Sequence, residues 1–161
     1  MQYSLERFKN EELFEIEPRE ELAKDLEAAQ NEAILNDVYT NGMPFFTLRA
    51  DGKIIVIYGF VYTGCGTYMP MVIASKYIHK HIRKVIQIFY DYFATYVPKD
   101  CRRLEAYCDI MDEKALRLAR HFGFDIIGIR HYASARGNDQ AILEKMVLHE
   151  IRKVRTQWSR T

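Results

Sequence analysis

The stretch of residues 102–124 constrains the fold of this chain most, because its apolar period changes within a few residues. The first half alternates apolar and polar residues as a strand does, and the second half repeats apolar residues at helical spacing. The change falls between Asp109 and Asp112. Asp112 is placed to cap the helix, and Gly123 stands where a left-handed residue would end it. The stretch therefore predicts a strand, a tight turn, a helix and a second turn.

The helical part of this stretch carries a motif. Residues 112–124 read DEKALRLARHFGF and resemble the second cofactor-side motif of the GNAT acetyltransferase superfamily, whose usual form is Asn-x-x-Ala-x-x-Leu-Tyr-x-x-x-Gly-Phe. The residues that match in register are Ala115, Leu118, Gly123 and Phe124. Asp112 takes the place of the family's Asn. Ala119 takes the place of the Tyr that protonates the departing thiolate in many members.

Length and charge limit the alternatives. A chain of 161 residues with 48% apolar residues can bury one core, and we expect a single domain over residues 1–149 with a basic tail over 150–161. The 23 basic and 22 acidic residues give no general attraction to nucleic acid or membranes. Three cysteines without CxxC spacing and an N-terminus without an apolar signal core predict a cytoplasmic protein. No apolar run approaches the roughly 20 residues that span a bilayer.

Apolar periods and turn residues predict the other elements in chain order. The expected strands are residues 13–16, 44–50, 53–62, 67–74, 103–109, 125–132 and 141–148. The expected helices run from Pro18 to about residue 33, over 36–41 as a short helix or loop, and from 77 to Pro98. This is the element order of the GNAT fold. The resemblance implies an α/β (α+β) fold with a mixed, mostly antiparallel sheet of six or seven strands flanked by about four helices.

The strand at residues 67–74 is the expected place of the cofactor arm. Pro70 lacks an amide hydrogen, so a bulge or a splay is expected there. In the GNAT fold the matching strand separates from its parallel neighbour, and the gap admits the pantetheine arm of coenzyme A. The resemblance therefore implies that Val72, Ile73 and Ala74 bind the cofactor, with unpaired backbone groups near these residues.

The start of the long helix departs from the family. GNAT proteins bind the pyrophosphate of acetyl-CoA with backbone amides in a loop of the form Gln/Arg-x-x-Gly-x-Gly/Ala, at a helix N-terminus that favours anions. The corresponding residues 75–84, SKYIHKHIRK, contain no glycine. Two interpretations stay open: the amides still bind the pyrophosphate with help from basic side chains, or the helix start is ordinary and its basic face is solvated. In the first, the cofactor-binding residues are Ile78, His79, Lys80, His81, Ile82, Arg83 and Asp112.

No metal is expected, because His79 and His81 are two residues apart and point to different faces of a helix. For catalysis, the amine must lose a proton and the thiolate must gain one. The acid that the family often has before the long helix is missing from residues 67–74. Glu105 and Tyr132 are the predicted catalytic residues. The other candidates are Tyr68, Tyr107, Asp109 and His131, and for each candidate packing or surface placement is the alternative role.

The function that the resemblance implies is transfer of an acyl group, expected to be acetyl, from acetyl-CoA as co-substrate to an amine. The alternative is a catalytically weakened protein of the same fold. The pattern from Gly59 to Gly123 also resembles acetyltransferase-like proteins of tailed bacteriophages, so the chain would then bind a structural or host protein, in the host cytoplasm or the virion. A protein acceptor and a homodimer are left open as partners. Nucleic acid is disfavoured by a net charge of only +1.

Overall fold

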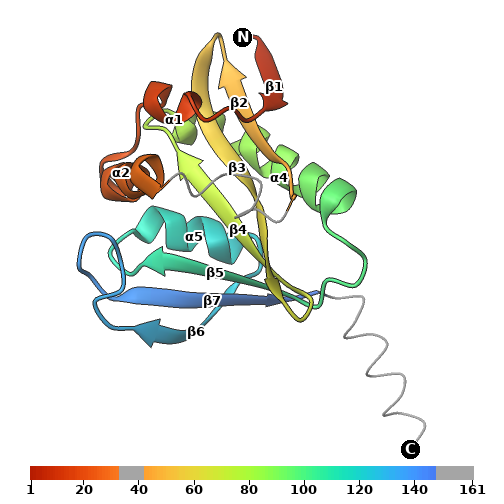
Figure 1. The fold of residues 1–161 in the computed structure, drawn as a ribbon, viewed down its shortest axis with the longest axis vertical. Coiled ribbons are helices and arrows are strands. Elements are labelled where there is room, and N and C mark those ends of the chain that lie inside the picture. The colour runs from red at the N-terminus through yellow and green to blue at the C-terminus, as the bar shows by residue number, and fades with distance from the viewer. Residues whose placement is uncertain (33–41, 148–161) are drawn as a thin grey trace, which may run out of the picture. The chain divides into compact units, whose positions relative to one another are not determined.

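The computed structural model describes residues 1–32 and 42–147 (Figure 1). The elements are β1 (Tyr3–Arg7), α1 (Glu12–Glu15), η1 (Glu20–Leu22), α2 (Ala23–Glu32), β2 (Phe45–Ala50), β3 (Lys53–Gly64), β4 (Thr67–Ala74), η2 (Ile78–His81), α4 (Ile82–Tyr96), β5 (Arg103–Asp109), α5 (Glu113–His121), β6 (Asp125–Arg130) and β7 (Gln140–Met146). The predicted helix or loop at 36–41, the helix end at 33, the last residue of the final predicted strand and the tail at 150–161 lie outside the described residues.

The seven strands of the described chain form one sheet in the order β1-β2-β3-β4-β5-β7-β6. Strands β4 and β5 are parallel, whereas β1 with β2, β2 with β3, β5 with β7 and β6 with β7 are antiparallel. Four α-helices accompany the sheet in the described residues. The predicted mixed, mostly antiparallel sheet of six or seven strands with about four helices is therefore confirmed.

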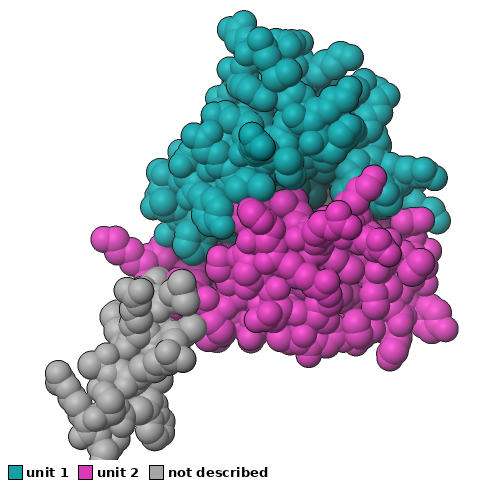
Figure 2. Space-filling view, turned by 180° about the vertical axis from the view of Figure 1, so that it is seen from behind, with its two compact units in different colours: residues 1–62, 70–97 teal, residues 63–69, 98–161 magenta. Residues whose placement is uncertain are grey.

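The chain divides into two compact units, which Figure 2 shows in different colours. The first contains Met1–Tyr62 and Pro70–Val97, and the second contains Thr63–Met69 and the residues from Pro98 onward. Strand β4 begins in the second unit and continues into the first at Pro70. The single-domain boundaries given above stay a prediction.

The core of the first unit is built on β3, where Ile55, Val56, Ile57 and Phe60 are almost fully buried. Helix α4 packs on one face of this sheet through aromatic rings: Phe60 lies 5.3 Å from Phe89 and stacks on Tyr92 at 5.1 Å. Gly59 is required opposite Phe45, because a Cβ at residue 59 would lie 2.6 Å from the Phe45 ring. The unit is therefore held by apolar contacts between β3 and α4.

The second unit packs α5 on one face of β5 and β7. Leu104 pairs with Lys145 across β5 and β7, and the Lys145 ammonium donates a hydrogen bond of 2.6 Å to the Phe122 carbonyl at the end of α5. Leu104 and Leu143 are buried on this face. Gly123 has a φ of +83°, so the predicted left-handed end of the helix is confirmed.

The prediction of a strand at residues 13–16 is wrong. Residues Glu12–Glu15 form helix α1, because Leu13 and Ile16 are both buried at helical spacing while Phe14 between them is 72% exposed. The prediction that Pro18 begins a helix is also wrong. Pro18 forms an antiparallel β-bridge with Ser75, and the first helical turn after it begins at Glu20. Strand β1 was not predicted.

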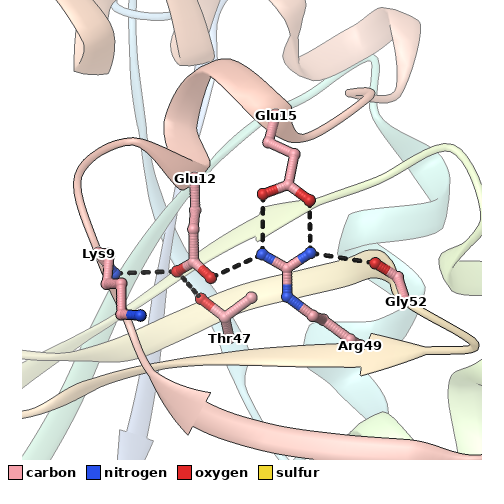
Figure 3. A network of polar contacts seen from close by, with 6 residues as sticks. All are labelled: Lys9, Glu12, Glu15, Thr47, Arg49 and Gly52. Carbon is pink, nitrogen blue, oxygen red and sulfur yellow. Dashed lines mark hydrogen bonds and ion pairs between the residues drawn. The ribbon is translucent and has the colours of Figure 1, made fainter.

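A buried ion pair ties α1 to β2 (Figure 3). The Glu12 carboxylate is only 6% exposed and accepts hydrogen bonds from Lys9 N at 2.9 Å, Thr47 Oγ1 at 2.6 Å and Arg49 Nη2 at 2.8 Å. Arg49 also forms two parallel bonds with the Glu15 carboxylate. Burial alone would raise the pKa of Glu12, but the hydrogen bonds from Thr47, Lys9 and Arg49 together lower it below its ordinary value.

We predict that Glu12→Gln lowers the free energy of unfolding by about 1.5–3 kcal/mol. The amide replaces one acceptor oxygen with a donor, which must then face either Arg49 or the two donors Lys9 and Thr47. The control Glu15→Gln, at a side chain that is 53% exposed, should cost less than about 1 kcal/mol. Urea unfolding measures both variants, and equal losses would contradict a special role for the buried carboxylate.

The same network predicts a dependence of stability on pH. Glu12 and Glu15 have pKa values below their ordinary 4.5, Glu15 because Arg49 donates to its carboxylate. The stabilisation is therefore fully present above about pH 5 and is lost as the pH falls through the lowered values. Urea unfolding between pH 6 and pH 3 should show this acid loss. A Glu12→Gln, Glu15→Gln double variant should show a smaller slope, and an unchanged slope would refute the assignment.

Candidate functional site

The outer edge of β4 is the first part of the candidate site. Ser75 N donates to Ile55 O on β3 at 3.0 Å, so Ser75 faces β3. Because successive residues of a strand alternate in direction, the backbone groups of Pro70, Val72 and Ala74 face the edge opposite β3. Proline is tolerated there because no β3 bond is lost. Strand β4 runs from Thr67 to Ala74, and its register with β5 ends at Tyr68, before Pro70.

The register between β4 and β5 covers two residue pairs, Thr67 with Arg103 and Tyr68 with Leu104. The predicted parallel pairing toward Thr67 is therefore confirmed. The prediction of unpaired backbone groups is wrong at Ala74, because Arg19 N donates to the Ala74 carbonyl at 3.3 Å. Val72 is 38% exposed and keeps its backbone groups on the outer edge.

In the turn between β4 and α4, most backbone amides already donate hydrogen bonds to other groups of the protein. Hydrogen bonds inside the first unit join Lys76 N to Glu17 O at 3.0 Å, Tyr77 N to Ser75 Oγ at 3.2 Å, Ile78 N to Ser75 O at 3.2 Å and Lys80 N to Tyr77 O at 3.1 Å. Without glycine, the loop closes on itself as a helical turn and presents no row of free amides. The backbone of this turn does not fit a pyrophosphate in the way the family motif would.

Basic side chains supply the charge at the same place. His79, Lys80 and Arg83 are exposed at the start of η2 and α4. His81 is 8% exposed, and its Nδ1 lies 3.0 Å from the Tyr3 hydroxyl. The side chain of His81 is therefore packed in the core, and its predicted role in binding the cofactor stays a prediction. Of the predicted cofactor residues in this turn, His79, Lys80 and Arg83 have exposed side chains, whereas Ile78 is buried and Ile82 is half-buried.

Asp112 caps α5. Its carboxylate accepts a hydrogen bond of 3.0 Å from Ala115 N, and the residue is 3% exposed. This confirms the predicted cap and explains why Asp can replace the family's Asn, since both side chains offer the same acceptor oxygen. Its predicted contact with the cofactor stays a prediction. The methyl side chain of Ala119 on α5 has no acidic proton, so any general acid must come from another residue.

Glu105 lies on the face of β5 that points away from α5. Tyr107 donates its hydroxyl hydrogen to the Glu105 carboxylate, and Arg103 Nη2 lies 3.3 Å from Glu105 Oε2. The hydrogen bond to Glu105 raises the pKa of Tyr107. The Arg130 guanidinium lies 5.0 Å from the centre of the Tyr107 ring. Glu105 is thus held in a charged cluster that spans β5 and β6.

Tyr132 lies in the loop after β6, with a left-handed φ of +51° and a side chain that is 84% exposed. Tyr132 N donates to Asp139 Oδ1 at 3.1 Å, and His131 Nδ1 lies 3.2 Å from the other oxygen of Asp139. Asn138 binds Asp109 through its side-chain amide at 3.0 Å. The predicted catalytic residues Glu105 and Tyr132 therefore lie in different hydrogen-bonded clusters.

Three further observations concern other classes of site. Within residues 1–32 and 42–147, no three His, Cys, Asp or Glu side chains are grouped to hold a metal ion. No helix among the described elements is long and apolar enough to cross a membrane. Burial raises the pKa of the Cys101 thiol to about 11, so it does not supply a thiolate nucleophile near neutral pH.

Comparisons with known proteins identify the fold. No protein-family model matches the chain, and no curated protein sequence does. Three of the solved structures that match do so along nearly their full length. An N-acetyltransferase from Staphylococcus aureus Mu50 is 17% identical over 91% of this chain and 99% of its own, with a TM-score of 0.61. Ard1 from Thermoplasma volcanium is 8% identical over 90% and 97%, with a TM-score of 0.68.

The third structure is a Bacillus subtilis acetyltransferase in complex with CoA, 18% identical over 91% of this chain and 99% of its own, with a TM-score of 0.64. The chain has the GNAT acetyltransferase fold. At such low identities the likeness shows the GNAT fold alone. The three named structures come from cellular organisms, and the resemblance to phage proteins stays a prediction.

Sequence reasoning missed the partner of the β4 edge, residues Glu17–Arg19. In the sequence, Pro18 indicates a helix start, and a single β-bridge has too few residues to show a strand period. The opposite charges of Glu17, next to Pro18, and Lys76 were the available signal that the two segments pair. It could not be interpreted without knowing that the two segments meet.

We predict that the cap at residue 112 follows the chemistry of its acceptor oxygen. Asp112→Ala should lower the free energy of unfolding by about 1 kcal/mol, because Ala115 N loses its partner. Asp112→Asn, which restores the residue usual in GNAT motifs, should stay within a few tenths of a kcal/mol of the parent. Thermal and urea unfolding of both variants test this, and an Asn variant as unstable as the Ala variant would show that the charge matters.

Proposed function

We propose that the chain transfers an acyl group from acyl-CoA, with acetyl-CoA as the expected donor, to an amine by direct attack. The observation that carries the proposal is the arrangement of β4: a parallel pairing with β5 that covers Thr67 and Tyr68, followed by outward-facing backbone at Pro70 and Val72. An extended ligand can add to such a strand edge through amide hydrogen bonds. The GNAT fold and the CoA complex of the Bacillus subtilis structure support this choice.

The residues that would hold acyl-CoA divide into two groups. The backbone of Val72 and Ala74 would bind the pantetheine arm, with Val72 as the main contact since Ala74 O already accepts from Arg19, whereas the backbone of Ile73 faces β3. Lys80 and Arg83, with His79, would hold the diphosphate by side-chain charge. Charged hydrogen bonds of this kind are strong but depend on salt. Ile78, His81 and Ile82 would only shape this part of the site. Asp112 would contribute indirectly, by capping the start of α5.

The bound thioester supplies an activated acyl carbon and a thiolate leaving group. The chain must take one proton from the attacking amine and deliver one to the thiolate sulfur. We assign the first task to the Glu105 carboxylate, which is held by Tyr107 and Arg103, and the second to the Tyr132 hydroxyl, which is exposed to the solvent. Either proton can pass directly or through a chain of water molecules.

A second candidate function is that of a protein-binding module with the same fold, such as a structural or host-binding phage protein. The internal bonds of Lys76, Tyr77, Ile78 and Lys80 amides favour it, since they remove the usual anion site. This candidate requires no acyl-CoA affinity. The two functions are therefore separated by one binding measurement.

We predict that isothermal titration calorimetry shows acetyl-CoA binding with a Kd in the micromolar range, about −8 kcal/mol at 1 μM. The affinity should fall with added salt, because side-chain cations rather than backbone amides hold the diphosphate. No heat and no thermal shift at millimolar acetyl-CoA would favour the protein-binding module.

We predict that the double variant Lys80→Ala, Arg83→Ala weakens acetyl-CoA binding by about 2 kcal/mol, roughly 30-fold. The control Lys114→Ala removes an exposed cation from α5 and should leave the Kd unchanged. Calorimetry at one salt concentration compares the three proteins. Equal affinity in all of them would place the diphosphate elsewhere.

A further inference from the structure

The outer edge of β4 already has an occupant. The Glu17–Arg19 segment lies antiparallel to residues 74–76, with Lys76 N donating to Glu17 O at 3.0 Å and Arg19 N donating to Ala74 O at 3.3 Å. Pro18 stands opposite Ser75, where its missing amide costs nothing, because Ser75 N bonds to β3 instead. The segment therefore pairs with the edge that faces away from β3.

Side chains hold the same segment at the loop that precedes η2. The Glu17 carboxylate forms an ion pair with Lys76 and accepts a hydrogen bond of 2.9 Å from the Tyr77 hydroxyl. Lys53 is a second positive charge near Glu17, and its Nζ lies 4.9 Å from the centre of the Tyr77 ring. The Glu17 carboxylate thus binds Lys76 and the Tyr77 hydroxyl, which are close in sequence to the proposed diphosphate-binding residues. A phosphate group would bind to the same two partners.

We infer that the Glu17–Arg19 segment competes with acyl-CoA for the β4 edge and that Glu17 sets the affinity for the acyl donor. The segment supplies what an extended, anionic ligand would supply: a backbone carbonyl and amide for residues 74–76, and a negative charge for Lys76 and Tyr77. This inference rests on the proposed function, because it takes β4 as the place of acyl-CoA. When the ligand binds, the segment leaves, and Lys76 becomes available to the diphosphate.

The energetic consequence follows from mass action. If the edge is open in only a fraction of molecules, the apparent Kd equals the intrinsic Kd divided by that fraction. A change that loosens the segment without touching β4 should therefore tighten binding. Glu17→Gln removes the charge, and Pro18→Gly adds backbone freedom to the released segment.

The test compares acetyl-CoA binding by calorimetry in the wild type, in the Glu17→Gln, Pro18→Gly variant and in the control Glu20→Gln, an exposed acid on η1. We expect the double variant to bind at least threefold more tightly and the control to match the wild type. Hydrogen exchange of the wild type gives a second measurement without any substitution. The Arg19 amide, which loses the Ala74 carbonyl when the segment leaves, should exchange faster when acetyl-CoA is saturating.

The possible outcomes separate the inference from the function on which it rests. Equal affinities, with the Arg19 amide equally protected with and without acetyl-CoA, would overturn the competition and leave the acyltransferase proposal standing. No binding in any of the three proteins would overturn the proposed function, and the competition with it. Urea unfolding of each protein shows that a lost signal does not come from a failure to fold.

Discussion

Strand β4 offers one edge to β3 and one edge to other partners, and the second edge governs the rest of the site. Thr67 and Tyr68 pair with β5 on it, and Ala74 accepts a hydrogen bond from the Glu17–Arg19 segment further along. Pro70 lies between these contacts and cannot donate a bond. Buried backbone groups need partners. The outer edge of β4 is therefore shared between different segments, and Val72 is the residue at which an extended ligand has backbone to bind.

The loss of glycine after β4 changes how an anion could be bound. A glycine-rich loop lets several amides converge on a phosphate. In this chain those amides bond to Ser75 and Tyr77 in a helical turn, and the positive charge comes from Lys80, Arg83 and Lys76. Side-chain charge is weakened by salt and by competing carboxylates, and Glu17 is such a competitor. The glycine-free turn is thus the reason why side-chain cations would have to bind the diphosphate. It is also the reason why a protein-binding module is the second candidate function.

The sequence predicted the parts of the fold that have a clear local signal. The Asp51-Gly52 turn, the strand that contains Pro70, the long helix before Pro98, the cap at Asp112 and the left-handed Gly123 all agree with the structure. Local patterns did not show α1, since four residues are too few to separate strand from helix period. They could not show the bridge of Pro18 with Ser75 or the bonds of Glu12 to Thr47 and Arg49, which join distant segments. The roles of Glu105 and Tyr132 stay predictions for the same reason.

The central claim is that acyl-CoA binds along the outer edge of β4 at Val72. Hydrogen exchange of the Val72 amide, measured by NMR with and without saturating acetyl-CoA, tests it most directly. The account predicts fast exchange in the free protein, because this amide faces the edge opposite β3, and marked slowing when acetyl-CoA is bound. A Val72 amide whose exchange rate is unchanged by acetyl-CoA, in a protein shown by calorimetry to bind it, would contradict the account.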